Sequence, residues 1–522
     1  ELWQKYYDKV VDSKEEFAIK KYPQLDPFFD FQNESDKIKK MVSDKNLKDI
    51  AQHSFLPFVK ILTKTPRFRY QESEKQYALE TKIRPIAFAS HFDTYIYGFY
   101  AFALNEKYQD YIRHHKFDDC ILAYRTDLDG KCNIQFAKEV FDIVKHRITN
   151  NKSCSAIAID ITGYFDNIDH SILKEKWCDI IGLPVLPIDQ FKVYRSLTKY
   201  SYINKNSILK HFKIDLDKQS KHWQSLLDLI PNSIVGSTFN EKMNLLRKRK
   251  LIVTNKEKIN KINGTIEYRG IPQGSAMSAV LSNIYLIDFD NWLKQQSIKH
   301  DFTYRRYCDD IIIICNTDDV KKINKKLVKE IEKYKVKIQS KKTELIEFKE
   351  NSKGVIRSFN KSKINKNNAT INSQNEQQYY KNLQYLGFEF NGQNIYIRPG
   401  SLSRYFRKMK GRIIKSIVMS YSDKSKKNKI LKKQIFERYS HLGRRNFLSY
   451  AINSSKEYYT NSSGVKKEGM NSLSIKRQLT SHFSILKRCM VEKSLQRYEL
   501  KLAKRMAKIE AGKRTKEVIY KQ

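Results

Sequence analysis

The pattern of apolar and polar positions changes twice along the chain. Residues 1 to about 80 mix aromatic and charged positions in a pattern typical of helices, with prolines at the breaks. From about 82 to 345, short apolar β-branched runs bounded by Gly, Asn and Asp alternate with helical stretches. From about 401 to 522 the pattern is helical and strongly basic. The sequence therefore predicts an α+β core with helical ends.

Three segments depart from this simple pattern. Residues 186 to about 262 are Lys-rich and mostly helical in pattern, and we interpret them as an insertion. Residues 349–378 are polar, which predicts an exposed loop. The segment LQYLGFEFNG at 383–392 predicts a hairpin, because Gly387 and Gly392 permit tight turns.

The segment SAIAIDITGYFDNIDH at 155–170 is apolar up to Asp160, turns at Gly163, and offers Asn167 or Asp169 as a helix N-cap. Asp160 is therefore expected where a buried strand ends. A carboxylate in that place is poorly solvated unless a cation binds it, so a metal ion is one interpretation. Ordinary turn chemistry is the other.

The segment FTYRRYCDDIIIIC at 302–315 predicts a β-hairpin with Asp309 and Asp310 at its tip. Adjacent carboxylates beside an apolar strand repel each other, which raises the cost of ionising both. A pair of Mg²⁺ ions removes that cost, and carboxylates that hold two metal ions are the machinery of nucleotidyl transfer. The alternative is a solvated Asp-Asp turn.

Charge narrows the choice of partner. The chain has 522 residues, 40% of them apolar, so it can bury a large core divided into several packed units. Lys and Arg number 99 against 57 acidic residues, a formal net charge of +42. An AT-rich genome also enriches Lys, but it does not favour Lys over Glu so heavily. The excess therefore predicts a polyanionic partner, with nucleic acid as the natural candidate.

Other classes of protein are disfavoured. The seven cysteines are scattered without a C-x-x-C pair, which predicts reduced thiols and no zinc module. We find no run of 18 or more apolar residues and no signal-peptide pattern, so we expect a cytoplasmic protein that does not use a membrane.

Three motifs occur along the chain in a characteristic order. Asp160 with Phe165, GIPQGSAMSAVLSN at 270–283, and YCDD at 307–310 together resemble the palm of reverse transcriptases. The resemblance implies a right-hand polymerase fold with fingers, palm and a basic helical thumb. It also implies RNA-directed DNA synthesis from dNTPs with two Mg²⁺ ions.

The resemblance assigns roles to the palm residues. It implies that Asp160 and Asp309 bind both metal ions and that Asp310 is an accessory acid. Phe165 resembles the steric gate that excludes a 2′-hydroxyl, and the alternative is that it is simply a core residue. Gln273 resembles the residue that lines the nucleotide pocket. RNA-templated RNA polymerases usually carry Gly-Asp-Asp and lack the Pro-Gln-Gly loop, so DNA synthesis is favoured.

Basic residues that contact the triphosphate are expected from three segments that resemble the family: KIRPIAFAS, CILAYR and KIQSKKTELIEF. A planar guanidinium binds phosphate oxygens with two parallel hydrogen bonds. The resemblance implies that a lysine before a Thr approaches the pyrophosphate. In chain order these residues are Arg84, Arg125 and Lys342, with Lys82 and Lys341 as weaker choices. Each arginine could instead be an ordinary surface side chain.

The expected domain organisation follows from these segments. We expect a helical N-terminal extension at 1–80, fingers at 81–154, a palm at 155–348 with a helical Lys-rich insertion at about 186–262, a polar loop and primer-grip-like hairpin at 349–400, and a basic helical thumb and C-terminal tail at 401–522.

Softer matches point to a subgroup. The segments at 90–104, 439–450 and 474–486 resemble those of bacterial antiphage reverse transcriptases, which are related to group II intron and abortive-infection types. The resemblance implies antiviral defence with a dedicated structured non-coding RNA as template. Tyr520 lies in a basic tail, where it either primes synthesis from its hydroxyl or is a frayed terminal aromatic.

Two other functions stay open at this point. One is an intron-maturase-like RNA-binding protein on the same fold, and the other is a template-independent nucleotidyltransferase. The sequence also leaves open whether the chain forms a homo-oligomer.

Overall fold

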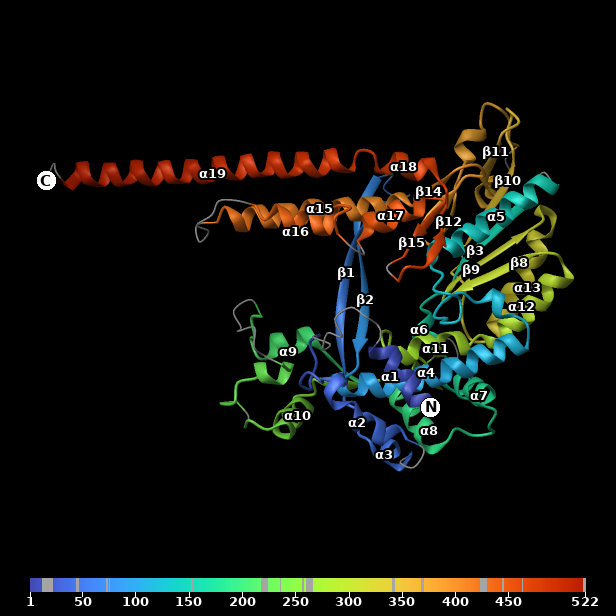
Figure 1. The fold of residues 1–522 in the computed structure, drawn as a ribbon, viewed down its shortest axis with the longest axis horizontal. Helices are drawn as coiled ribbons and strands as arrows, with labels where there is room; N and C mark the ends of the chain where they lie inside the picture. Colours follow the sequence, from blue (N-terminus) through green and yellow to red (C-terminus); the bar gives the residue numbers. More distant parts are fainter. Residues whose placement is uncertain are drawn as a thin grey trace. The chain divides into compact units, whose positions relative to one another are not determined.

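The structure is a computed structural model (Figure 1). It describes residues 1–11, 22–43, 47–71, 74, 76–151, 154–216, 224–234, 236–255, 258–259, 266–339, 343–367, 370–422, 430–443, 446–461 and 463–519. The chain divides into two compact units. Unit 1 comprises Glu1–Asp127, Ile159–Ile313 and Lys321–Thr343, and unit 2 comprises Leu128–Ala158, Ile314–Val320 and Glu344–Gln522.

A long antiparallel ribbon of two strands stands out in unit 1 (Figure 1). Strand β1 (Phe58–Gln71) pairs with β2 (Gln76–Phe88) from Val59↔Phe88 to Gln71↔Gln76. The prediction that residues up to about 80 are helical is therefore wrong from residue 58 onward. Alternating side chains in both strands satisfy a two-residue period, and cross-strand pairing along the whole ribbon outweighs the local helical pattern.

The Lys-rich stretch at 186–262 adds strands as well as helices to unit 1. Strand β4 (Ser201–Asn204) runs parallel to β1, and β5 (Ile252–Thr254) pairs antiparallel with β4, which gives the sheet order β2-β1-β4-β5. Apolar residues of this stretch pack with Val59 of β1 in one buried cluster. The helical expectation therefore holds for its helices α8, α9 and α10 but not for β4 and β5.

The rest of unit 1 is largely helical. Helix α4 (His91–His114) packs against α11 and α7, and buries most of its aromatic side chains. The other helices are α1 (Leu2–Val11), α2 (Phe31–Val42), α3 (Leu47–Gln52), α6 (Tyr164–Asn167), α7 (His170–Ile181), α8 (Ile188–Thr198), α9 (Lys205–His211), α10 (Phe239–Lys248), α11 (Ala276–Ile284), α12 (Ile287–Lys299) and α13 (Val320–Glu332), and a small hairpin is formed by β6 (Lys258–Ile259) and β7 (Ile266–Glu267).

The central sheet has the order β11-β10-β3-β9-β8. Its strands are β3 (Cys154–Asp160), β8 (Thr303–Tyr307), β9 (Asp310–Cys315), β10 (Glu344–Glu350) and β11 (Ile356–Asn360). The four isoleucines of β9 are all at most 1% exposed. A strand covered on both faces has no polar side, which explains this continuous apolar run.

The prediction of an exposed loop at 349–378 is wrong for much of its length. Strand β10 continues to Glu350, β11 pairs with it antiparallel, and α14 (Lys361–Lys366) follows. The Asn351 side chain accepts hydrogen bonds from the N–H groups of Lys353 and Val355 and so closes the turn. Phe359, buried in this otherwise polar segment, anchors β11.

Unit 2 also holds a small sheet and the basic helices. Strands β12 (Leu383–Tyr385), β13 (Phe388–Phe390) and β14 (Ile395–Ile397) form the predicted hairpin and a third strand, and β15 (Tyr458–Thr460) pairs with β16 (Lys466–Glu468). The helices are α5 (Asn133–Asn151), α15 (Pro399–Ser420), α16 (Lys432–Tyr439), α17 (Phe447–Ser455), α18 (Leu473–Leu479) and α19 (His482–Ile519).

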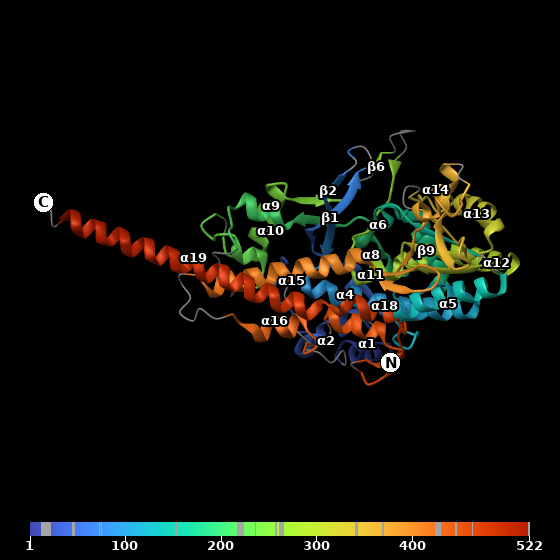
Figure 2. The same ribbon diagram turned by 90° about the horizontal axis from the view of Figure 1, so that it is seen from above.

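Helices α15 and α19 lie side by side in both views (Figures 1 and 2). Tyr405 contacts His482 at one end of the pair, and Tyr421 contacts Tyr498 at the other, so the two helices run parallel. The helical prediction for residues 401–522 is confirmed for α15 to α19 but is wrong at β15 and β16, which pair with each other. Among the helices that the structure describes, none combines the length and apolar character needed to cross a bilayer.

Candidate active site

The backbone brings the predicted carboxylates together within unit 1. Asp160 is the last residue of β3, as its place after an apolar run predicts. The next residue, Ile161, donates its N–H to the carbonyl of Asp309 at 3.2 Å, and Asp310 begins β9. The carbonyl of Asp160 accepts the N–H of Gln339 at 2.9 Å. Residues about 150 positions apart in the chain therefore meet at one end of the central sheet.

A buried ion pair fixes the hairpin that carries Asp309. Arg306 on β8 and Asp290 on α12 are both fully buried, and the Arg306 Nε donates to Asp290 at 2.8 Å. The same guanidinium donates to the carbonyl of Cys308 at 3.1 Å, one residue before Asp309. Burial raises the pKa of the Asp290 carboxyl, and the adjacent Arg306 acts in the opposite direction.

Sequence reasoning missed both members of this pair. The available signal was the alternation of β8, in which Tyr304 and Arg306 both point inward while their neighbours are partly exposed. An arginine at an inward position of a central strand requires a buried acceptor, because an unpaired buried charge is very costly.

The loop before α11 is clamped between two other segments of unit 1. On one side, Ile271 donates its N–H to the carbonyl of Phe165 at 3.0 Å. On the other side, Ala87 of β2 donates its N–H to the carbonyl of Gln273 at 2.8 Å. Gly274 has φ +124°, and a Cβ at this position would lie 2.9 Å from the Ala87 carbonyl oxygen. Only glycine combines this backbone conformation with such close approach.

A cavity of about 580 Å³ opens beside this loop. Phe165 and Gln273, both predicted from the sequence, line it, and so do Ile86 and Phe88 of β2. Side chains two residues apart in a strand share a face, so Arg84 lies on the same face of β2 as these two residues. Arg84 is therefore placed next along the ribbon from the cavity wall.

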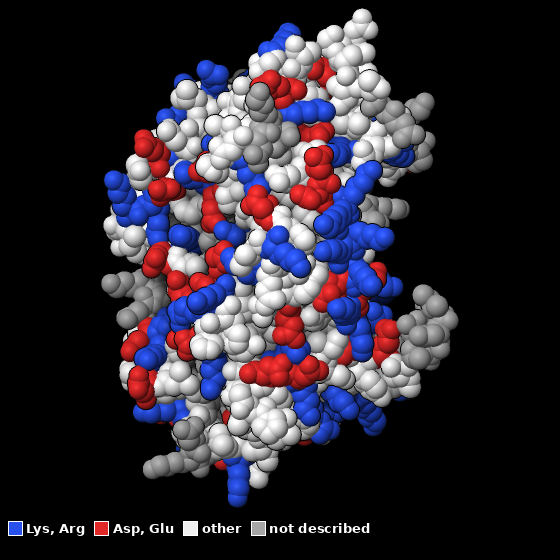
Figure 3. Space-filling view, turned by 90° about the vertical axis from the view of Figure 1, so that its right-hand side faces the viewer, with Lys and Arg blue, Asp and Glu red and all other residues white. Residues whose placement is uncertain are grey.

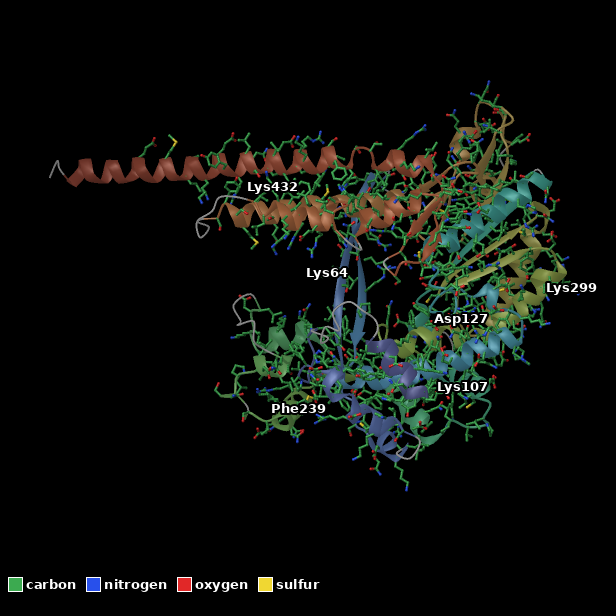
Figure 4. The ribbon with its side chains drawn as sticks, viewed as in Figure 1. Lys64, Lys107, Asp127, Phe239, Lys299 and Lys432 are labelled. Carbon is green, nitrogen blue, oxygen red and sulfur yellow. The ribbon has the colours of Figure 1, made fainter. Side chains whose placement is uncertain are left out.

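Arg125 lies differently from Arg84. Its side chain is 1% exposed, and its Nε and Nη2 donate to Asp127, which Figure 4 labels, at 2.7 and 2.6 Å. Its Nη1 donates to the carbonyls of Asp118 and Ile121. In this arrangement the guanidinium holds together the loop that precedes α5. The predicted contact of Arg125 with a triphosphate stays a prediction.

Three predicted residues lie outside the described part of the chain. These are Lys341 and Lys342, in the segment before β10, and Tyr520, after α19.

Comparison with known proteins bears on the palm segment. Residues 211–390 match the family model described as reverse transcriptase (RNA-dependent DNA polymerase). The matched range contains Gln273, Asp309 and Asp310, and Asp160 lies ahead of it. The chain contains a reverse transcriptase domain. The domain has the mixed helix and antiparallel sheet content that the sequence predicts.

Solved telomerase structures give weaker matches. Telomerase from Candida albicans, in complex with a fragment of telomeric RNA, aligns at 12% identity over 74% of this chain and 56% of that chain, with a TM-score of 0.30. Apo telomerase from Candida tropicalis aligns at 12% identity over 91% of this chain and 71% of that chain, with a TM-score of 0.35. The chain thus spans a little over half the length of the Candida albicans protein. No curated protein matches the sequence.

The donor set at this end of the central sheet suits a hard divalent cation. Asp160 and Asp309 offer carboxylate oxygens, which Mg²⁺ prefers. Among the described residues, no group of three or more His, Cys, Asp or Glu side chains is arranged to hold a metal ion. Mg²⁺ commonly binds one or two carboxylates and completes its shell with water and substrate phosphates. Two adjacent aspartate positions therefore fit such an ion.

We expect the Arg306–Asp290 pair to dominate the stability of unit 1. Asp290→Asn should lower the free energy of unfolding by about 3–5 kcal/mol, because it leaves a buried guanidinium without its counter-charge. Asp290→Leu combined with Arg306→Met should recover part of that loss. Among the described residues, Trp3, Trp177 and Trp292 belong to unit 1, so urea denaturation followed by tryptophan fluorescence measures this effect.

The surface pair Lys37–Glu34, also in unit 1, provides the control. Lys37→Met should change stability by at most about 1 kcal/mol. Equal effects of Asp290→Asn and Lys37→Met would contradict the central role of the buried pair.

Proposed function

We propose that this protein is an RNA-directed DNA polymerase that uses Asp160, Asp309 and Asp310 as its catalytic carboxylates. The observation that carries the proposal is the backbone contact between Ile161 and Asp309, which joins the ends of β3 and the β8–β9 hairpin. Nucleotidyl transfer needs carboxylates from separate segments at one point, because two metal ions must be held a few ångströms apart.

In this proposal two Mg²⁺ ions are the cofactors, and when bound they lower the pKa of the attacking 3′-hydroxyl and neutralise charge on the leaving pyrophosphate. The chain itself orients the reacting groups. The carbonyl of Cys308, fixed by Arg306, and the backbone contacts of Asp160 keep the carboxylate-bearing segments in place. Such fixed positioning supplies catalysis because little reorganisation is needed during the reaction.

The cavity beside Gln273 is the proposed nucleotide pocket. Phe165 in its wall acts as the steric gate that favours dNTPs, and Arg84, on the face of β2 that continues the wall, reaches the triphosphate. Lys342 and Tyr520 keep the roles that the family resemblance implies, as a pyrophosphate contact and as a protein primer.

The proposed template is RNA, with DNA as the product. A net charge of +42 supports a polyanionic partner, and Figure 3 shows Lys and Arg side chains gathered along one margin of the visible face. The finer proposal is a dedicated non-coding RNA copied during antiviral defence. It rests on the resemblance of residues 90–104, 439–450 and 474–486 to antiphage enzymes, and loss of phage protection in an Asp309→Ala strain tests it.

Polymerase activity should depend on the hairpin carboxylates. Asp309→Ala combined with Asp310→Ala should abolish incorporation of labelled dNTPs on a primed RNA template, because the metal ligands are removed. Asp318→Ala combined with Asp319→Ala removes the same charge from the turn that follows β9 and should leave incorporation near wild type. Supplying single dNTPs with and without the template separates copying from untemplated addition. Activity that survives in the first variant would refute the assignment.

Phe165 should control the choice of sugar. Phe165→Ala should lower the ratio of kcat/KM for dNTPs over rNTPs by about 10- to 200-fold, the range that one steric contact in a pocket commands. Phe239→Ala, at an exposed position labelled in Figure 4, is the matched control and should leave the ratio unchanged. An unchanged ratio in Phe165→Ala would mean that Phe165 serves only as packing.

RNA affinity should fall steeply with salt. Each phosphate neutralised by Lys or Arg releases counterions, so the logarithm of the binding constant should fall linearly with the logarithm of salt concentration. Six to ten such contacts would reduce affinity by about 10³- to 10⁵-fold between 50 and 200 mM salt. Filter binding with the full chain measures the slope, and a flat response would contradict the electrostatic argument.

A further inference from the structure

Two residues next to the proposed catalytic carboxylates have an unusual backbone. Tyr124, in the loop before Arg125, has φ +61°, and Cys308, directly before Asp309, has φ +58°. Side chains other than glycine rarely adopt this left-handed conformation, and a bulky aromatic does so least readily. Residues held in this region need surrounding structure to fix them and often mark functional sites.

These two residues contact each other, although 184 positions separate them in the chain. The Tyr124 hydroxyl donates to the Cys308 sulfur at 3.6 Å. Cys308 is 4% exposed, whereas 44% of Tyr124 is exposed.

The loop that carries Tyr124 is held by hydrogen bonds to α11 and β8. Asn283 of α11 donates its side-chain amide to the carbonyl of Ala123 at 2.8 Å, and Leu122 donates its N–H to the carbonyl of Arg306 at 2.9 Å. The loop is therefore tied to the same residue, Arg306, that holds the Cys308 carbonyl. A ring on such a support keeps its place when a ligand packs against it.

Tyr124 also lines the cavity that contains Phe165 and Gln273. One face of this residue is therefore presented to the cavity, while its hydroxyl contacts the residue before Asp309. This connects the proposed nucleotide pocket with the proposed metal-binding turn through a single side chain.

We propose that Tyr124 is a positioning residue that keeps a nucleotide in the cavity aligned with the turn that carries Asp309. Its ring forms a wall on which the nucleotide packs, and its hydroxyl holds the Cys308 sulfur and so the turn. This inference deepens the proposed polymerase function and rests on it. The two halves of Tyr124 predict separate effects, because the hydroxyl and the ring can be removed independently.

Kinetics on a primed RNA template test the two halves. Tyr124→Phe removes only the hydroxyl and should lower kcat by about 3- to 10-fold with little change in KM for dNTP, the range for one lost hydrogen bond. Tyr124→Asn keeps a residue that tolerates positive φ but removes the ring, and should raise KM about tenfold as well. Tyr458→Phe, on an exposed tyrosine, is the control and should behave as wild type.

A double-variant cycle tests the contact itself. Cys308→Ala and Tyr124→Phe should each lower kcat, and the combined variant should be no slower than the slower single variant, because both changes break one interaction. Multiplied effects would overturn the proposal that the two residues act together.

Alkylation of Cys308, followed peptide by peptide by mass spectrometry, gives a readout without catalysis. Adding dNTP and Mg²⁺ should slow the alkylation of Cys308 but not that of Cys489. Tyr124→Phe should speed the alkylation of Cys308 and weaken its protection by dNTP and Mg²⁺. If the wild type polymerises normally while neither kinetics nor labelling responds to Tyr124→Phe, the inference falls and the polymerase stands. If the wild type fails to polymerise on any template, the proposed function falls, and a labelling response would still support the contact.

Discussion

The Arg306–Asp290 ion pair is the constraint on which the geometry of the candidate site depends. Two full charges out of reach of water are tolerated only when each meets the other in good geometry and the remaining donors are satisfied. Arg306 meets this demand with Asp290, with the side chain and carbonyl of Asn283, and with the carbonyl of Cys308. A strand, two helices and the turn before Asp309 are thereby fixed by one guanidinium.

The clamped loop at Gln273 adds a second constraint to unit 1. One backbone hydrogen bond joins Ile271 of this loop to Phe165, and another joins Gln273 to Ala87. Together they fix the loop on both sides just before α11 begins. Gly274 makes this possible because it has no side chain to collide with β2. The cavity wall is thus built from rigid backbone contacts, with Phe165 and Gln273 presented by neighbouring segments rather than by mobile loops.

Left-handed backbone at Tyr124 and Cys308 fits the same logic. A strained conformation persists only where the surrounding contacts determine it completely, and both residues sit among bonds made by Arg306 and Asn283. Strain and support therefore coincide at the place where the proposed catalytic turn meets the proposed pocket. Arg125 shows the opposite case, since the hydrogen bonds of its side chain to described residues lie within its own loop and stabilise that loop.

The sequence by itself determined the elements that depend on neighbours along the chain. An apolar run that ends in Asp160, a hairpin with Asp309 at its tip, and the glycine-bearing loop at Gln273 are all visible as local patterns, because periodicity and turn chemistry act over a few residues. The ribbon of β1 and β2 escaped this reasoning, since its stability comes from cross-strand pairing. Only the tertiary structure decided which partners meet: Asp290 for Arg306, and Cys308 for Tyr124. A pattern along the chain reveals which face a side chain takes, but the partner on that face is chosen by the packing of segments that are distant in sequence.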